Sequence, residues 1–192
     1  MRRRRIQEIN AWSRGKFAGL VGPVFEHSAW IAAMTWEKRP FAGFKDLHRA
    51  LCETVKNCGA KKQLALIRAH PDLVGRLAQA GQLTKESAQE QSGAGLDRLS
   101  PAEAERFQKN NAAYRDRFDF PFVICARLNK KQAILAGFKR RLNHSREQEI
   151  KTALEEIFKI AKLRLCDLTW SGRPAPKKGR RAPVIKNKRR QP

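Results

Sequence analysis

The sequence has 192 residues, a length that suits one domain with a real hydrophobic core. Hydrophobic residues make up 41% and charged residues 31% of it, and no apolar run approaches the roughly 18 residues that a membrane span needs. Four scattered cysteines (Cys52, Cys58, Cys125 and Cys166) form no C-x-x-C pair. This pattern argues against a zinc site or a disulfide framework and favours a reducing cytoplasm.

The formal net charge of +23 is concentrated at the two ends of the chain. Residues 2–5 are four arginines, and residues 171–192 carry nine basic side chains and no acidic one. We therefore expect a basic N-terminal arm (1–5), a folded domain (6–170) and a disordered basic tail (171–192). The N-terminus leads into no apolar stretch and the C-terminus is not Ser-Lys-Leu, so we expect neither a secretory nor a peroxisomal signal, and a cytoplasmic location.

The dominant hydrophobic period in the folded domain is helical. Leu47 and Leu51, with Val55 four residues later, predict a helix over 44–57 that Gly59 ends. No comparable segment alternates between apolar and polar residues as a half-buried strand does. The sequence therefore predicts an all-α, single-domain bundle of several helices.

Two further helices are expected on either side of a polar hinge. The first covers 61–69 and must stop near His70, because Pro71 disfavours helical geometry at the residue before it. The second covers 72–80 and ends at Gly81.

Two capping boxes predict the starts of the last long helices. Residues 100–103 (SPAE) open a helix to about 115, and residues 145–148 (SREQ) open the longest helix, to about 168. Between these helices lies one apolar, partly β-branched run. It is too short and isolated to build a sheet, so we expect a short extended segment near 120–126.

The last helix carries a charge among its apolar residues. At about 100° per residue, Arg164 falls near the middle of the apolar face, whereas Glu155, Glu156, Lys159 and Lys162 fall outside it. An unpaired buried charge is costly, so a buried Arg164 should have an acidic partner or line a pocket; otherwise it extends to solvent from the rim. Periodicity alone favours the rim. The apolar face consists of Ile150, Leu154, Ile157, Ile160, Ala161, Leu165 and Leu168.

Two other segments break the apolar pattern. Histidine is the natural acid or base near neutral pH, but His70 taken alone is more often a helix-terminal residue. Ser87 and Glu90 are three residues apart, as on one helical face or in a capping box, and a Gly-rich turn follows them. The remaining histidines show no metal-ligand spacing, and we treat them as structural: His27, beside Glu26, and His48 and His144.

These breaks coincide with motifs of a known family. Residues 69–75 (AHPDLVG) resemble the A-H-P-D-L-x-G signature of the 2-oxo-4-hydroxy-4-carboxy-5-ureidoimidazoline (OHCU) decarboxylases. Residues 87–97 resemble that family's S-x-x-E-Q-x-x-A-G-L-D, and residues 111–124 resemble its N-x-x-Y-x-x-[KR]-F-G-F-P-F-[IV]-I. Residues 39–41 and 160–165 match its R-P-F and final-helix segments. The resemblance spans roughly residues 17–168, and five motifs in register make it specific.

The resemblance implies cofactor-free and metal-free decarboxylation of OHCU to (S)-allantoin and carbon dioxide in urate degradation. It implies that His70 is the acid/base residue, that Glu90 orients its imidazole and that Arg164 binds the anionic substrate. Ser87 and Gln91 would bind the ureido arm or the ring carbonyls. Further residues implied to bind substrate are Pro71, Phe122, Val123, Ile124, Cys125 and Ala126. A homodimer is suggested by analogy with the family alone.

The chain departs from the family pattern in three places. Asp119 stands where the family usually has Gly, and because Asp tolerates a left-handed backbone we expect the turn to be kept. Residues 26–30 read EHSAW where Glu-His-Ser-Pro-Trp is often seen. The basic ends have no family counterpart, and they favour solubility or weak contact with polyanions.

Two other functions remain open at this stage. A nucleic-acid-binding protein would use the cationic ends, although the sequence shows no nucleic-acid module. A catalytically inactive relative that serves as a binding module is the weaker alternative, because His70, Glu90 and Arg164 are all retained.

Overall fold

The computed structural model describes residues 3–75, 78 and 80–169. Within them the chain is all-α, as expected, and the one β-type pairing is an isolated bridge between Arg4 and Thr169. The predicted basic tail 171–192 lies outside the described residues. The elements, with 3₁₀ turns labelled η, are α1 Ile6–Asn10, α2 Arg14–Val21, η1 Gly22–Val24, α3 Trp30–Thr35, η2 Trp36–Lys38, α4 Phe44–Lys56, α5 Ala60–Arg68, α7 Lys85–Gly93, α8 Pro101–Phe118, η3 Ala126–Leu128, α9 Lys131–Arg141 and α10 Arg146–Leu168.

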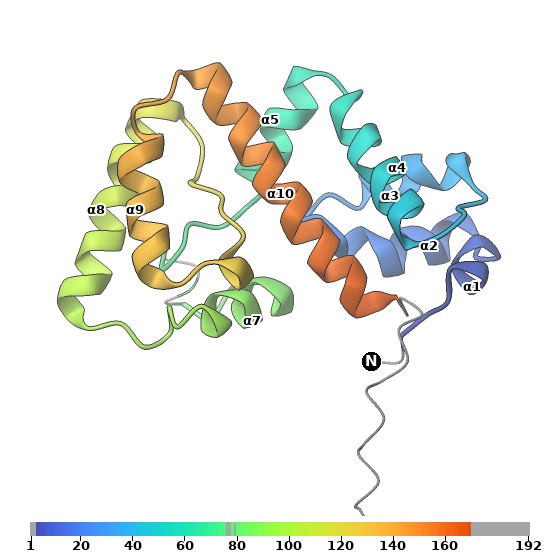
Figure 1. Cartoon of the computed structure of the whole chain (residues 1–192), viewed down its shortest axis with the longest axis horizontal. Coiled ribbons are helices and arrows are strands. Elements are labelled where there is room, and N and C mark those ends of the chain that lie inside the picture. The colour runs from blue at the N-terminus through green and yellow to red at the C-terminus, as the bar shows by residue number, and fades with distance from the viewer. Residues whose placement is uncertain (1–2, 76–77, 79, 170–192) are drawn as a thin grey trace, which may run out of the picture.

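Helix α10 runs through the middle of the molecule and divides it (Figure 1). Helices α8 and α9 lie on one side of it and α1 to α4 on the other, while α10 itself packs against α4, α5 and η1. The N-terminal segment closes on its far end, where the Arg4 N–H donates to the Leu168 carbonyl at 2.9 Å. Among the described residues, no helix is long and apolar enough to cross a membrane.

Both predicted capping boxes are present. The Ser100 hydroxyl accepts from the Glu103 N–H, and the Ser145 hydroxyl accepts from the Gln148 N–H. Each therefore satisfies one of the amide groups that a helix start leaves without a partner in the helix. The helix predicted from Ser145 to Leu168 is confirmed as the 23-residue α10.

Glu156 was predicted to lie outside the buried face of α10. This prediction is wrong, because Glu156 is buried and only 9% exposed. The prediction of one apolar face assumed that the opposite side of the helix is in contact with solvent. Helix α10 is covered on two sides, so polar residues beyond the apolar stripe also become buried.

The helix predicted from Asp72 does not begin there. Residues 72–75 form a turn in which Val74 takes a positive φ of 55°, and much of 76–80 lies outside the described residues. The turn is held from outside, since the Val74 N–H donates to the Gln91 side chain and Arg115 pairs with Asp72. Gly75 allows the close return of the chain, because a Cβ there would lie 2.7 Å from Cβ of Asp72.

The departure at Asp119 is accommodated as expected. Asp119 ends α8 in the left-handed conformation, with φ 63° and ψ 30°. Its carboxylate pairs with the Arg68 guanidinium, and its carbonyl accepts from Arg68 Nε at 3.1 Å. The helix then turns into the extended segment that reaches η3.

Two substitutions at Asp119 separate backbone strain from the loss of the ion pair. Both Asp119→Ala and Asp119→Gly remove the carboxylate that pairs with Arg68, but only alanine places a Cβ in a left-handed backbone. We expect the alanine variant to unfold with a free energy about 1 kcal/mol lower than the glycine variant. Urea denaturation measures the difference, and equal stabilities would show that the backbone leaves this conformation.

Candidate active site

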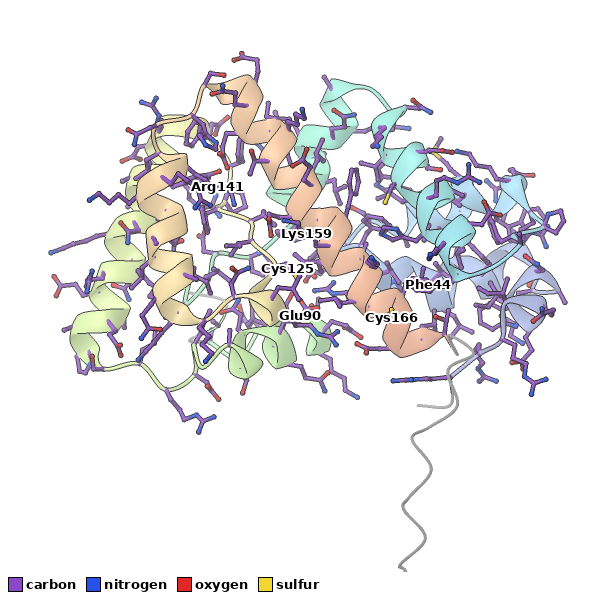
Figure 2. All side chains as sticks on the ribbon, in the orientation of Figure 1. Phe44, Glu90, Cys125, Arg141, Lys159 and Cys166 are labelled. Carbon is purple, nitrogen blue, oxygen red and sulfur yellow. The ribbon has the colours of Figure 1, made fainter. Side chains whose placement is uncertain are left out.

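Residues from four parts of the chain meet at one small cavity. His70 follows α5, Ser87 and Glu90 lie on α7, Arg164 lies on α10, and the extended segment forms the remaining wall. Figure 2 places Glu90 near the middle of the molecule, beside α10. The cavity has a volume of about 30 Å³, and its lining residues are His70, Pro71, Leu73, Ser87, Glu90, Gln91, Phe122, Val123, Ile124, Ala126, Ile160 and Arg164.

The lining includes every residue of the predicted site except Cys125. The Cys125 side chain is buried, and its backbone N–H donates to the Glu156 carboxylate instead. Burial raises the pKa of this thiol to about 11, so it stays protonated at neutral pH.

His70 presents one ring nitrogen to the cavity. Its Nδ1 lies 2.9 Å from the Leu66 carbonyl, which can only accept a hydrogen bond, so Nδ1 carries the proton. Nε2 is buried and has no hydrogen-bond partner among the described protein atoms. Burial lowers the pKa of His70 to about 4, despite the opposing effects of the Leu66 carbonyl and Glu26. The imidazole is therefore neutral near pH 7, with a lone pair on Nε2.

Arg164 is buried and all its N–H groups are directed at acceptors. Nε and Nη2 hold the two oxygens of Glu90 at 2.9 and 2.8 Å, and Nη2 also donates to the Ser87 hydroxyl at 3.1 Å. Nη1 donates to Glu26 at 2.8 Å and to the Pro23 carbonyl at 3.3 Å. Burial works against the charge, but Glu90 and Glu26 hold the pKa of Arg164 above its usual range. Of the two alternatives for Arg164, the buried and paired one is confirmed.

Glu26 is a site residue that the sequence did not reveal. It is 2% exposed and accepts hydrogen bonds from Arg164, Ser87 and Thr84. Burial alone would raise its pKa, but the Thr84 hydroxyl and the Arg164 guanidinium hold the pKa of Glu26 below its usual value. Two features of the sequence could have indicated Glu26. A buried Arg164 needs an acidic partner, and Glu26 directly follows the apolar residues 24–25.

The expected contact between Glu90 and the His70 imidazole is wrong for this structure. Glu90 faces the Arg164 guanidinium, and the Leu66 carbonyl orients the imidazole. A buried guanidinium needs countercharge more than a neutral imidazole does, so the carboxylate pairs with the cation.

Ser87 and Gln91 lie at the cavity but already have protein partners. The Ser87 hydroxyl donates to Glu26, and the Gln91 carbonyl oxygen accepts from Val74 at 3.0 Å. Their shared effect is to fix the walls of the cavity. Their expected contact with the ureido arm stays a prediction.

A larger cleft adjoins the small cavity. It has a volume of about 680 Å³ and shares Glu90 and Arg164 with the cavity beside His70. Its other lining residues come from α2, η1, α7 and α10, with Arg127 of η3. The Glu90–Arg164 pair therefore separates an open cleft from the buried histidine. Among the described residues, no group of three or more His, Cys, Asp or Glu side chains could hold a metal ion.

Comparison with known proteins gives one consistent family. A sequence relative from Halalkalicoccus jeotgali, named 2-oxo-4-hydroxy-4-carboxy-5-ureidoimidazoline decarboxylase, is 42% identical over 88% of this chain and 94% of its own. A relative of the same name from Mus musculus is 42% identical over 84% of this chain and 90% of its own.

A solved structure and a family model agree with these relatives. The crystal structure of an (S)-allantoin synthase superposes with a TM-score of 0.70 at 29% identity, over 86% of this chain. This chain spans about half the length of that one (54%). The family model described as OHCU decarboxylase matches residues 10–166. The chain belongs to the OHCU decarboxylase family of urate degradation.

Proposed function

We propose that the chain converts OHCU to (S)-allantoin and carbon dioxide at the cavity of His70, Arg164, Glu90 and Glu26. The observation that carries this assignment is a buried, neutral histidine whose Nε2 has no hydrogen-bond partner in the described part of the chain, beside a buried guanidinium. The histidine supplies a proton acceptor, and the guanidinium supplies a binding site for an anion. The family of the chain supports the same reaction.

His70 acts first as a base in this mechanism. The substrate carries a hydroxyl and a carboxylate on the same ring carbon, C4, and the ureido arm on C5. Loss of carbon dioxide leaves an electron pair that forms a C4=C5 double bond, while the electron pair of the former C5=N1 bond moves to N1, which takes a proton from solvent. Nε2 accepts the hydroxyl proton as C4 becomes a carbonyl, and the resulting imidazolium returns a proton to one face of C5. His70 thus moves the hydroxyl proton to C5, and the one further proton that the anionic substrate consumes comes from solvent. The Leu66 carbonyl keeps the imidazole in the required tautomer.

Substrate binding requires a rearrangement of the Arg164 pair. A cavity of about 30 Å³ holds little more than one water, whereas the neighbouring cleft of about 680 Å³ admits a substituted ring. The substrate carboxylate then replaces Glu90 on the Nε–Nη2 edge of Arg164, where two parallel hydrogen bonds are available. Glu26 stays on Nη1, because it is more deeply buried than Glu90.

The remaining expectations belong to this proposal. The chemistry assigned to these side chains uses no metal or cofactor. A homodimer, a cytoplasmic location and weak polyanion contact by the two basic ends stay predictions.

Removing the imidazole tests the base directly. We expect His70→Ala to lower kcat by roughly 10²-fold or more, because the hydroxyl proton loses its acceptor. OHCU is generated in situ from urate with the two upstream enzymes, and the optical rotation of (S)-allantoin is followed. His48→Gln, at a half-buried histidine outside the cavity, is the matched control. Normal turnover by a folded His70→Ala protein would refute the assignment.

The pH dependence tests the buried state of His70. Only the neutral imidazole accepts a proton, so activity is lost as the pH falls toward its pKa of about 4. We therefore expect kcat/KM to stay level from about pH 8 to about pH 5.5. A loss centred near 6.5, the ordinary value for histidine, would show that water reaches the ring in the free enzyme.

Arg164→Lys tests the need for a planar fork of donors. One ammonium cannot serve Glu26 and a bidentate carboxylate together, so we expect kcat/KM to fall by roughly 10-fold or more. Arg49→Lys, at an exposed arginine paired with Asp46, is the control for loss of a guanidinium. Unchanged kinetics in Arg164→Lys would mean that the substrate does not take the place of Glu90.

A further inference from the structure

The extended segment that walls the cavity depends on partners outside itself. Residues 121–125 have no regular secondary structure, so their buried N–H and C=O groups need acceptors and donors from other elements. Two charged side chains meet this need on adjacent peptide units. Arg141 Nη1 donates to the Val123 carbonyl at 2.7 Å, and the Cys125 N–H donates to Glu156 Oε2 at 2.8 Å.

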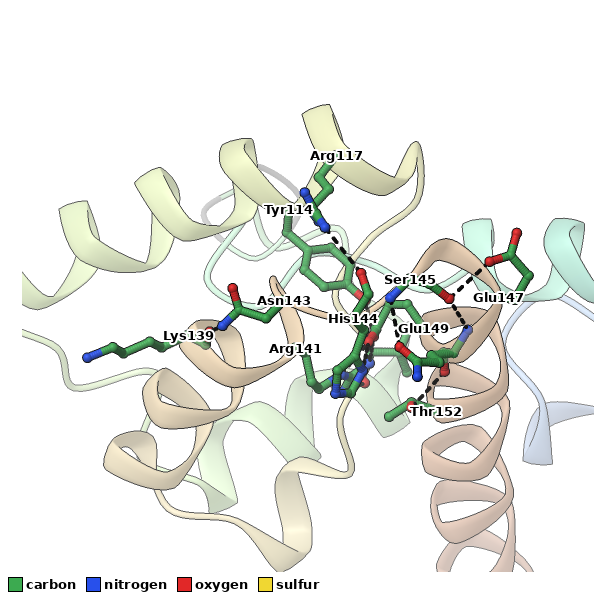
Figure 3. Close-up of polar contacts among 12 residues, drawn as sticks. Tyr114, Arg117, Lys139, Arg141, Asn143, His144, Ser145, Glu147, Glu149 and Thr152 are labelled. Carbon is green, nitrogen blue, oxygen red and sulfur yellow. Dashed lines mark hydrogen bonds and ion pairs between the residues drawn. The ribbon is translucent and has the colours of Figure 1, made fainter.

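Arg141, near the end of α9, is itself held rigidly. Its residue is 2% exposed, and its guanidinium pairs with Glu149, which is fully buried (Figure 3). Glu149 also accepts from the Tyr114 hydroxyl and lies 2.8 Å from His144 Nδ1. Burial raises the pKa of Tyr114, so its hydroxyl keeps the proton that it donates. Each of the three guanidinium nitrogens therefore has a protein acceptor.

Arg141 contacts the cavity wall twice. Besides its bond to Val123, its guanidinium carbon lies 4.3 Å from the ring centroid of Phe122. Both Phe122 and Val123 line the cavity beside His70. Any shift of Arg141 therefore moves the wall that faces the imidazole.

Glu156 holds the next peptide unit from the opposite element. It lies on α10, and its other oxygen pairs with Lys159 Nζ at 2.5 Å. Two opposite charges, one on α9 and one on α10, thus fix the segment on either side of Ile124, whose residue lines the cavity.

We propose that Arg141 and Glu156 are positioning residues, which set the distance between bound substrate and His70 by fixing the 122–126 backbone. This inference rests on the proposed function. Displacements of about 1 Å between reacting groups cost up to roughly 10² in rate, so backbone anchors of this kind affect the reaction without touching the substrate. A loosely placed intermediate also takes its proton from water on either face, which lowers the optical purity of the product.

The test compares the same exchange at Arg141 and at a neighbouring exposed arginine. Arg141→Lys keeps a positive charge near Glu149 but cannot serve both Glu149 and the Val123 carbonyl. We expect kcat/KM to fall by roughly 10-fold or more and the enantiomeric excess of allantoin to drop. Arg140→Lys makes the same exchange at the exposed neighbour of Arg141 and leaves the Val123 contact in place, so its kinetics should stay normal.

If Arg141→Lys does not fold, a second pair of variants tests whether the 122–126 backbone must be fixed. Glu156→Gln keeps an oxygen for the Cys125 N–H and should retain optical purity, whereas Glu156→Leu removes the acceptor and should lose it. Chromatography of allantoin on a chiral column gives the readout. Normal kcat/KM and normal optical purity in both Arg141→Lys and Glu156→Leu would overturn the inference alone. No (S)-allantoin from the wild-type chain would overturn the proposed function as well.

Discussion

The burial of one guanidinium constrains the arrangement of the whole site. Arg164 is buried, where an unpaired charge would be strongly unfavourable. Its donors draw together η1 through the Pro23 carbonyl, the following loop through Glu26, and α7 through Ser87 and Glu90. Segments 138 and 74 residues away in sequence are therefore fixed relative to α10 by one side chain.

The same constraint explains the electrostatic state of His70. The cluster around Arg164 is satisfied internally, and no carboxylate of the described residues hydrogen-bonds to the imidazole. Burial therefore outweighs the opposing charge of Glu26 and lowers the pKa of His70. A histidine beside a carboxylate would instead tend toward the charged form. Because Arg164 holds these carboxylates, the imidazole keeps its proton acceptor available at neutral pH.

Local features of the fold were predictable from the sequence, whereas partnerships across the chain were not. The capping boxes at Ser100 and Ser145 and the left-handed Asp119 depend on nearest neighbours, and each is confirmed. The anomalous position of Arg164 on its helix indicated a buried pair, but Glu26 lies in another segment with no spacing rule to connect them. The turn at 72–75 was likewise misread as helix, because Gln91 and Arg115 stabilise it from elsewhere in the chain.

Helix α10 carries three of the charged side chains that hold the site and its supporting network. Glu149 completes the Arg141 network, Glu156 holds the Cys125 amide, and Arg164 gathers Glu26 and Glu90. Each added or lost residue in a helix turns everything beyond it by about 100° and shifts it by about 1.5 Å. One insertion or deletion between Glu149 and Arg164 would therefore disengage the network at one end from the site at the other. The spacing of these residues along α10 therefore sets how the two clusters lie relative to each other.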